Sequence, residues 1–310
     1  MKRTVIGIVP LMLFLTAGCV EGGESCRYAA DRRLQASLDG VQRIVVRAGP
    51  GELVVQGEAG RGELDASGRA CASRRSRLEG VQVRASRAGD VLEVITEPGP
   101  RSAERGGFGT QDERLDLTLL VPAGMTLDIE DSSGALQVSD VGSLRVRDGS
   151  GLIRIRDVAG DVSVDDGSGS IEIERVGGRV HIPRDGSGGM DIREVRGEVL
   201  IDDDGSGEIV IARVGGDVVI GEDGSGDIEI EDVEGGVRIE RDGSGGIRVR
   251  RVARDVHIGS DGSGAVRVED VGGDFTLDRK GSGDVSYARI GGAVRLDRVG
   301  RAREAAGSGG

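Results

Sequence analysis

The sequence contains 310 residues, with 41 basic and 54 acidic side chains and a formal net charge of −13 at pH 7. This excess of acid argues against nucleic acid and against an anionic membrane surface as binding partners. Aromatic residues make up only 2% of the chain, so the stacking platforms that bind sugars or bases are missing.

The N-terminus has the features of an export signal. Lys2 and Arg3 precede an apolar run from Val5 to Ala17. This run is too short to span a membrane and is typical of a secretory signal peptide. We therefore expect residues 1–18 to be a signal peptide that is removed.

The segment that follows the apolar run resembles a bacterial lipobox, with Thr16 where leucine is usual and Cys19 as the lipidated residue. We expect a lipoprotein that reaches the membrane through this anchor; ordinary cleavage nearby, with Cys19 left free, is the alternative. Val20 is not the aspartate that would hold a lipoprotein in the inner membrane, which favours the outer membrane. Whether the periplasmic or the external face carries the protein stays open.

If the protein is exported, the two remaining cysteines, Cys26 and Cys71, lie in an oxidising compartment. An even pair in such a compartment favours a disulfide. Two free thiols are the less favoured alternative.

The chain divides into a tether at residues 19–37, an irregular β region at 38–125 and a regular array at 126–297. Alternating apolar residues from Leu115 to Val121 indicate a half-buried strand within the irregular region. Residues 298–310 end in Gly-Ser-Gly-Gly and indicate a flexible tail.

A motif of four residues, Asp-Gly-Ser-Gly, defines the array. Every step is 19 residues from Asp166 to the variant Lys-Gly-Ser-Gly at Lys280. A second variant, Asp-Ser-Ser-Gly, begins at Asp131. A fixed short period indicates one structural unit stacked on copies of itself. Complete copies begin at Asp148, Asp166, Asp185, Asp204, Asp223, Asp242 and Asp261.

Each repeat reads as two short strands. With the motif Asp as position 1, apolar residues fall at positions 6, 8, 11, 15 and 17, as in Ile228, Ile230, Val233, Val237 and Ile239. Spacing of two is strand periodicity. One repeat cannot bury its apolar face alone, so we predict an all-β fold, a single-stranded parallel β-solenoid (β-helix) with coils of about 19 residues. The crossover rule favours right-handed winding.

Position 10 provides an independent test of stacking, because its charge changes sign at every repeat. Residues 19 apart have no local reason to alternate, whereas stacked coils would place each one about 4.8 Å from an opposite charge. The residues are Asp157, Arg175, Glu194, Arg213, Asp232, Arg251, Asp270 and Arg289.

The recurring Gly-Ser-Gly, Ile-x-Ile, Val, Gly and Val-x-Ile pattern resembles a bacterial putative adhesin family of unknown function, related to putative auto-transporter adhesin head domains. The segment from Leu115 to Gly134 is also similar to that family. The resemblance covers about residues 38–297. It implies an envelope β-solenoid and brings no catalytic residues.

The motif aspartates are the sharpest candidate site. Stacking would align Asp148, Asp166, Asp185, Asp204, Asp223, Asp242 and Asp261 in a row of like charges about 5 Å apart. Calcium between the coils would relieve their repulsion. The favoured alternative is that each carboxylate accepts N–H groups of its own turn.

The sequence therefore predicts a non-enzymatic envelope lipoprotein whose solenoid is a scaffold or interaction surface for an envelope or surface protein or a glycan, with no required cofactor. The alternatives are a calcium-dependent binding module that uses the aspartate row and, less favoured, a carbohydrate-active enzyme. No catalytic residue is assigned, because the carboxylates are spread evenly along the chain and no acid–base pair stands out. His181 and His257 both occupy position 16 and are expected on the surface.

Overall fold

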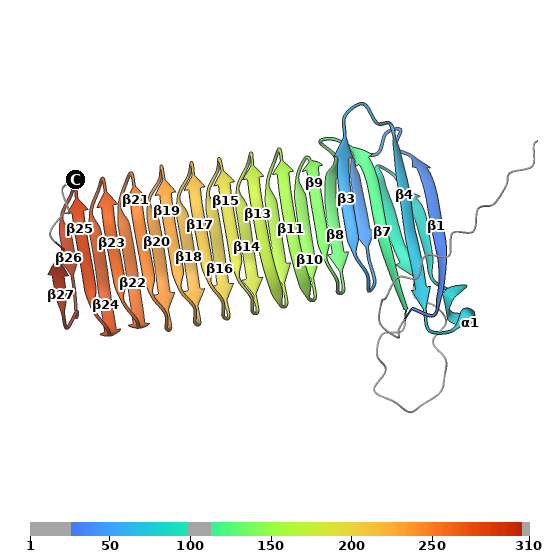
Figure 1. Ribbon diagram of the computed structural model, residues 1–310. Helices are drawn as coiled ribbons and strands as arrows, with labels where there is room; N and C mark the ends of the chain where they lie inside the picture. Colours follow the sequence, from blue (N-terminus) through green and yellow to red (C-terminus); the bar gives the residue numbers. More distant parts are fainter. Residues whose placement is uncertain (1–25, 98–112, 306–310) are drawn as a thin grey trace, which may run out of the picture.

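The computed structural model describes residues 26–97 and 113–305. The signal peptide, Cys19 and the end of the tail lie outside the described residues. Stacked strands form a long β-solenoid, with α1 (Arg75–Leu78) at one end and the C-terminus at the other (Figure 1). The predicted all-β solenoid is confirmed.

Two sheets face each other along the solenoid, and each coil contributes one strand to each sheet. In the regular part all neighbouring strands are parallel, and position 1 of one coil lies opposite position 1 of the next. The first sheet is ordered β1(Tyr28–Ser37), β4(Glu63–Ala72), β7(Glu113–Pro122), β3(Leu53–Glu58), β9(Leu136–Val141), β11(Gly151–Val158), β13(Gly169–Val176), β15(Met190–Val195), β17(Ile209–Val214), β19(Ile228–Val233), β21(Ile247–Val252), β23(Val266–Val271), β25(Val285–Ile290) and β27(Ala302–Glu304).

The strands of the second sheet are given from the C-terminal end of the solenoid to the N-terminal end. Its order is β26(Val294–Leu296), β24(Phe275–Ser282), β22(Val256–Ser263), β20(Val237–Asp242), β18(Val218–Asp223), β16(Val199–Asp204), β14(Val180–Asp185), β12(Val162–Asp166), β10(Leu144–Asp148), β8(Thr126–Asp131), β2(Arg43–Arg47), β6(Val91–Glu97) and β5(Gln82–Ala88).

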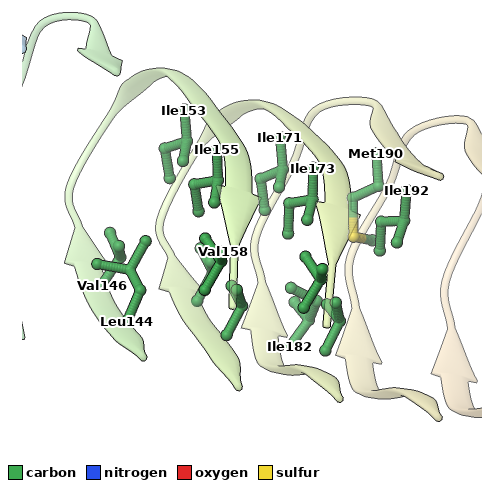
Figure 2. Packing of buried hydrophobic residues seen from close by; sticks show 14 of the residues in the cluster. Leu144, Val146, Ile153, Ile155, Val158, Ile171, Ile173, Ile182, Met190 and Ile192 are labelled. Atoms are coloured by element: carbon green, nitrogen blue, oxygen red, sulfur yellow. The ribbon is translucent and has the colours of Figure 1, made fainter. Parts of the chain in front are cut away.

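The core is a set of files of aliphatic side chains that project inward from the two sheets. Ile153 and Ile155 lie beside Ile171 and Ile173 of the next coil, and Met190 takes the next place in the file (Figure 2). These side chains are at most 1% exposed. Full burial of one such side chain stabilises the fold by about 1.5–3 kcal/mol. A single coil cannot bury these side chains, so this stabilisation depends on stacking of the coils.

The N-terminal end differs from the predicted tether. Residues 28–37 form β1, which pairs antiparallel with β4, and β4 pairs antiparallel with β7. The prediction of a tether over residues 19–37 is therefore wrong for residues 28–37. Alternate side chains of β1, such as Leu34, are half-buried against the core, and this packing holds the strand in the sheet. The predicted tail also contains a short strand, β27.

A disulfide joins Cys26 to Cys71, whose Cα atoms are 5.3 Å apart. It links the start of β1 to the end of β4. We expect the double variant Cys26→Ala/Cys71→Ala to lose about 4 kcal/mol of unfolding free energy, because the bond closes a loop of 45 residues. Urea unfolding of the oxidised protein and the variant measures the loss. Equal urea midpoints would contradict it.

The corner at positions 2–4 requires glycine where the coils approach closely. Gly188 has φ +138°, and a Cβ atom on it would lie 1.5 Å from the carbonyl oxygen of Gly169. We expect Gly188→Ala to cost more than about 3 kcal/mol, since both the backbone angle and the coil spacing must change. The adjacent Gly189→Ala is the control, because its Cβ would meet only the Glu208 carbonyl oxygen, at 3.7 Å. Similar melting temperatures for the two variants would refute the argument.

Candidate functional site

The motif aspartates form a continuous row inside the solenoid. Strand pairing places each one opposite the next. All of them are buried, with at most 8% exposure, and those from Asp166 onward are at most 3% exposed. The row consists of Asp131, Asp148, Asp166, Asp185, Asp204, Asp223, Asp242 and Asp261.

Turn amides bind one oxygen of each carboxylate at the beginning of the row. The Gly149 N–H donates to Asp148 Oδ1 at 2.8 Å, and the Ser132 N–H donates to Asp131 Oδ1 at 2.9 Å. From Asp185 to Asp242 the carboxyl oxygens are buried and make no hydrogen bond of good geometry. Turn amides still lie close enough to oppose the rise in pKa, as the Ser206 N–H does for Asp204. The turn amides therefore bind the first carboxyl groups with good geometry and the later ones more weakly.

Burial raises the pKa of these carboxyl groups. The pKa rises to about 6 in Asp166 and Asp185 and to about 7 in Asp204, Asp223 and Asp242, because burial disfavours the charged form and the adjacent aspartates repel it. Burial also raises the pKa of Asp148 and Asp261. The later carboxyl groups therefore hold protons near neutral pH, which reduces the repulsion along the row.

Lys280 closes the row. It takes the place of the motif aspartate in the last coil, opposite Asp261, and its Nζ lies 3.0 Å from Asp261 Oδ2. The two side chains are 1% and 0% exposed. Lys280 Nζ also donates to the Ser282 carbonyl oxygen. This buried ion pair lowers the pKa of Asp261 against the effect of burial.

A calcium ion needs six to eight oxygen ligands. Among residues 26–97 and 113–305, no group of three or more His, Cys, Asp or Glu side chains is arranged to hold a metal ion. The row offers one carboxyl group from each coil, on atoms that solvent does not reach. Calcium binding by these aspartates stays a prediction.

The charges at position 10 form ion pairs in the structure. Each arginine pairs with the position-10 acid of only one of the two adjacent coils. Arg175 binds Asp157 at 2.7 Å, Arg213 binds Glu194 at 3.0 Å, and Arg251 binds Asp232 at 2.5 Å. Arg289 binds Asp270 in the same way. In each case the arginine turns toward the acid of the preceding coil, and its guanidinium lowers the pKa of Asp157, Asp232 and Asp270.

All position-10 residues adopt left-handed backbone angles, with φ between 54° and 60° from Asp140 to Arg289. This conformation costs a non-glycine residue about 1–2 kcal/mol. It turns the chain sharply before the position-11 valine. The backbone angle was not predicted from the sequence, because charged residues, rather than glycine or asparagine, occupy this position.

A groove follows this corner along the solenoid. It has a volume of about 1360 Å³ and is lined by positions 10, 11 and 12 of six consecutive coils, from Asp157 to Ala253, and by Asp270. We call it the corner groove. Buried valines such as Val214 form its floor, and the paired charges of position 10 form one wall. The remaining positions include small residues such as Gly177 and Ala253.

The histidines lie on the outer face of the second sheet. His181 Nε2 is 2.8 Å from Asp202 Oδ2, and His257 Nε2 is 3.0 Å from Asp278 Oδ2. Ser163 lies beside His181 on the neighbouring strand, but within the described part of the chain no hydrogen bond joins their side chains. A serine nucleophile needs such a contact with its base.

No protein-family profile and no curated protein matches the sequence. Among solved structures, the chain is similar to a putative adhesin from Parabacteroides distasonis, with 11% identity, a TM-score of 0.40 and coverage of 87% of this chain and 97% of that one. A putative adhesin from Parabacteroides merdae shows 9% identity, a TM-score of 0.32 and coverage of 87% and 96%.

A putative cell adhesion protein from Clostridium sporogenes shows 14% identity, a TM-score of 0.32 and coverage of 72% of this chain and 99% of that one. The three proteins carry the description of the family that the repeat motifs resemble. At these scores the similarity does not assign a function to this chain.

No helix within the described ranges is long and apolar enough to cross a membrane.

Proposed function

We propose that this protein is a non-enzymatic lipoprotein of the cell envelope whose solenoid is an adhesin-like interaction surface. The corner groove is the observation that carries this proposal. Its apolar floor runs across six coils while its charged wall is internally paired. Such a surface can accept a long partner while the position-10 charges keep their own ion pairs.

A groove-filling variant tests this surface. Ala253 is exposed and lines the corner groove, so Ala253→Trp places a large ring in it without disturbing the core. Labelled mature protein is incubated with isolated envelopes, and bound protein is measured against concentration. We expect saturable binding that Ala253→Trp weakens. The control is Ala265→Trp, an exposed alanine outside the groove. Equal binding by the two variants would refute the groove, and unsaturable binding by the wild type would refute the interaction function.

The membrane anchor is a separate part of the proposal. Lipid on Cys19 would hold the protein at the outer membrane, facing the periplasm or the exterior. Fractionation of cells that express Cys19→Ala is expected to move the protein from the membrane to the soluble fraction. Unchanged membrane association would reject lipidation at Cys19.

The second candidate function is calcium-dependent binding through the aspartate row, and the buried carboxyl oxygens from Asp185 to Asp242, which make no hydrogen bond of good geometry, favour it. Calcium would replace protons there, so it should raise the melting temperature most at pH 8. A melting temperature that does not change with calcium would leave the interaction surface as the function.

A further inference from the structure

The outer face of the second sheet has a shallow hollow near its N-terminal end. Its volume is about 300 Å³, and it lies over β2, β8, β10, β12 and β14. This volume is at the lower end of the range for small-molecule sites. We call it the basic hollow and define it by Arg43, Asp128, Arg145, Asp161, Ser163, Arg179 and His181.

Two arginines of the basic hollow have no ion pair or hydrogen bond from their side chains within the described part of the chain. Arg43 lies on β2 and Arg145 on β10, and β8 alone separates the two strands. The two strands are therefore about 9.6 Å apart. Arg47, four residues further along β2, pairs with both Glu93 and Glu130. Acidic side chains of this sheet therefore pair with Arg47 but not with Arg43 and Arg145, whose guanidinium groups can bind a ligand.

A carboxylate lies beside Arg145, on the strand that separates the two free arginines. Asp128 is the neighbour of Arg145 on β8, and its Oδ1 is buried without a hydrogen-bond partner. A buried acceptor without a donor is costly. Asp128 as a whole is half-buried, and its carboxylate has no ion pair or hydrogen bond among the described residues, so a ligand hydroxyl group can donate to the second oxygen, Oδ2. Ser163 lies on the other side of Arg145.

The charge balance of the basic hollow is opposite to that of the chain. Arg43, Arg145 and Arg179 carry three positive charges, Asp128 and Asp161 carry two negative ones, and the sum is +1 with His181 neutral. The whole chain carries −13. Arg179 is held 3.6 Å from Asp161, so the free positive charge belongs to Arg43 and Arg145.

We propose that the basic hollow binds an anionic sugar unit, with its carboxylate or phosphate on Arg43 and Arg145 and a ring hydroxyl on Asp128. Guanidinium groups bind both anions through paired N–H donors. The carboxylate of Asp128 accepts a hydroxyl proton, which distinguishes a sugar from a simple anion. The assignment rests on the proposed interaction function and names a ligand class for that surface.

Calorimetric titration of the mature protein tests the assignment with four probes: a trigalacturonate, a sugar phosphate, a neutral trigalactoside and inorganic phosphate. We expect binding of one or both anionic sugars and no binding of the neutral trisaccharide. The preferred anionic sugar identifies the carboxylate or the phosphate as the natural group. Binding of inorganic phosphate as tightly as the sugars would refute the sugar contact, and no binding of any probe would refute the site.

The chain offers a matched control for the arginines. Arg238 occupies the same column as Arg145 but is held by His257 at 2.8 Å and lies 3.5 Å from Glu240. We expect Arg145→Ala to weaken anionic sugar binding about tenfold or more, the equivalent of losing one charge-assisted contact, and Arg238→Ala to leave it unchanged. Equal effects of the two variants would indicate a general charge effect and overturn the site.

Asp128→Ala separates the two halves of the proposed contact. It removes the acceptor, so sugar binding should weaken, whereas phosphate binding should not, because the variant also loses a negative charge beside Arg145. Melting curves confirm that each variant is folded. These titrations use isolated sugars, so they can fail while envelope binding through the corner groove persists, and the two proposals are tested separately.

Discussion

Asparagine in place of Asp223 is expected to make the protein more stable at pH 8 and to have little effect at pH 4. Burial and the neighbouring Asp242 raise the pKa of Asp223 from 3.8 to about 7. Between these values the folded chain keeps a proton that the unfolded chain has released. The protonated carboxyl group of Asp223 is therefore fully compatible with the folded state below pH about 4. This contribution to the free energy of unfolding is lost as the pH rises through about 7.

The amide of asparagine keeps the shape of a protonated carboxyl group and cannot ionise. At pH 8 the variant should gain about 2–4 kcal/mol of unfolding free energy, since a shift of one pKa unit corresponds to 1.36 kcal/mol. The coupling of neighbouring aspartates makes the lower end the expected value. Urea unfolding at pH 4, 6 and 8 measures the gain.

Asp203→Asn is the control for this prediction, because Asp203 is exposed and directly precedes the row residue Asp204. It removes the same formal charge and should change stability by only a few tenths of a kcal/mol. Parallel pH profiles for wild type and Asp223→Asn would show that the carboxyl group of Asp223 is not the group that titrates.

Loss of the Lys280 ammonium is expected to have the largest effect of any single side-chain change on the row. Lys280→Met leaves Asp261 buried with no opposite charge, and breaking a buried ion pair costs about 3–5 kcal/mol. The loss should be largest at pH 8 and smaller at pH 5, where Asp261 can take up a proton instead. Thermal and urea unfolding at both pH values measure it.

The double variant Lys280→Met/Asp261→Asn distinguishes the ion pair from lost packing. It removes both charges, so most of the stability at pH 8 should return. The neighbouring Arg279 is exposed, and Arg279→Met should have little effect. A double variant as unstable as Lys280→Met would attribute the loss to the shape of the lysine side chain.

The sequence predicts the stacking of the coils well because the same apolar and charged positions recur in every repeat. A valine or isoleucine at each inward position, as in Ile228 and Ile230, has one arrangement that buries every copy. The alternation of charge at position 10 then predicts the ion pairs, such as Arg251 with Asp232. The preference of each arginine for the preceding coil is not visible in the sequence, because it depends on the direction in which the corner turns the side chain.

The sequence predicts the ends of the solenoid and the state of the aspartate row less well. Residues 28–37 lack the repeat, and their place beside β4 depends on pairing across the chain. A row of aspartates can be read as exposed turn acceptors, and only the coordinates show that Asp204 and Asp223 are buried. Lys280 was the available signal, since a lysine that replaces one aspartate of a stacked row indicates an internal opposite charge.

Because position 1 of each regular coil lies directly opposite position 1 of the next, the length of this protein can change in whole units without redesign. A tandem duplication of 19 residues would add about 4.8 Å to the solenoid, since each coil interacts mainly with its two neighbours. Deletion of one unit would shorten it by the same distance. Such changes would leave the Cys26–Cys71 bond and the Lys280 ion pair in place at the two ends, so recombination between repeats can vary the reach of the molecule while its folding rules stay the same.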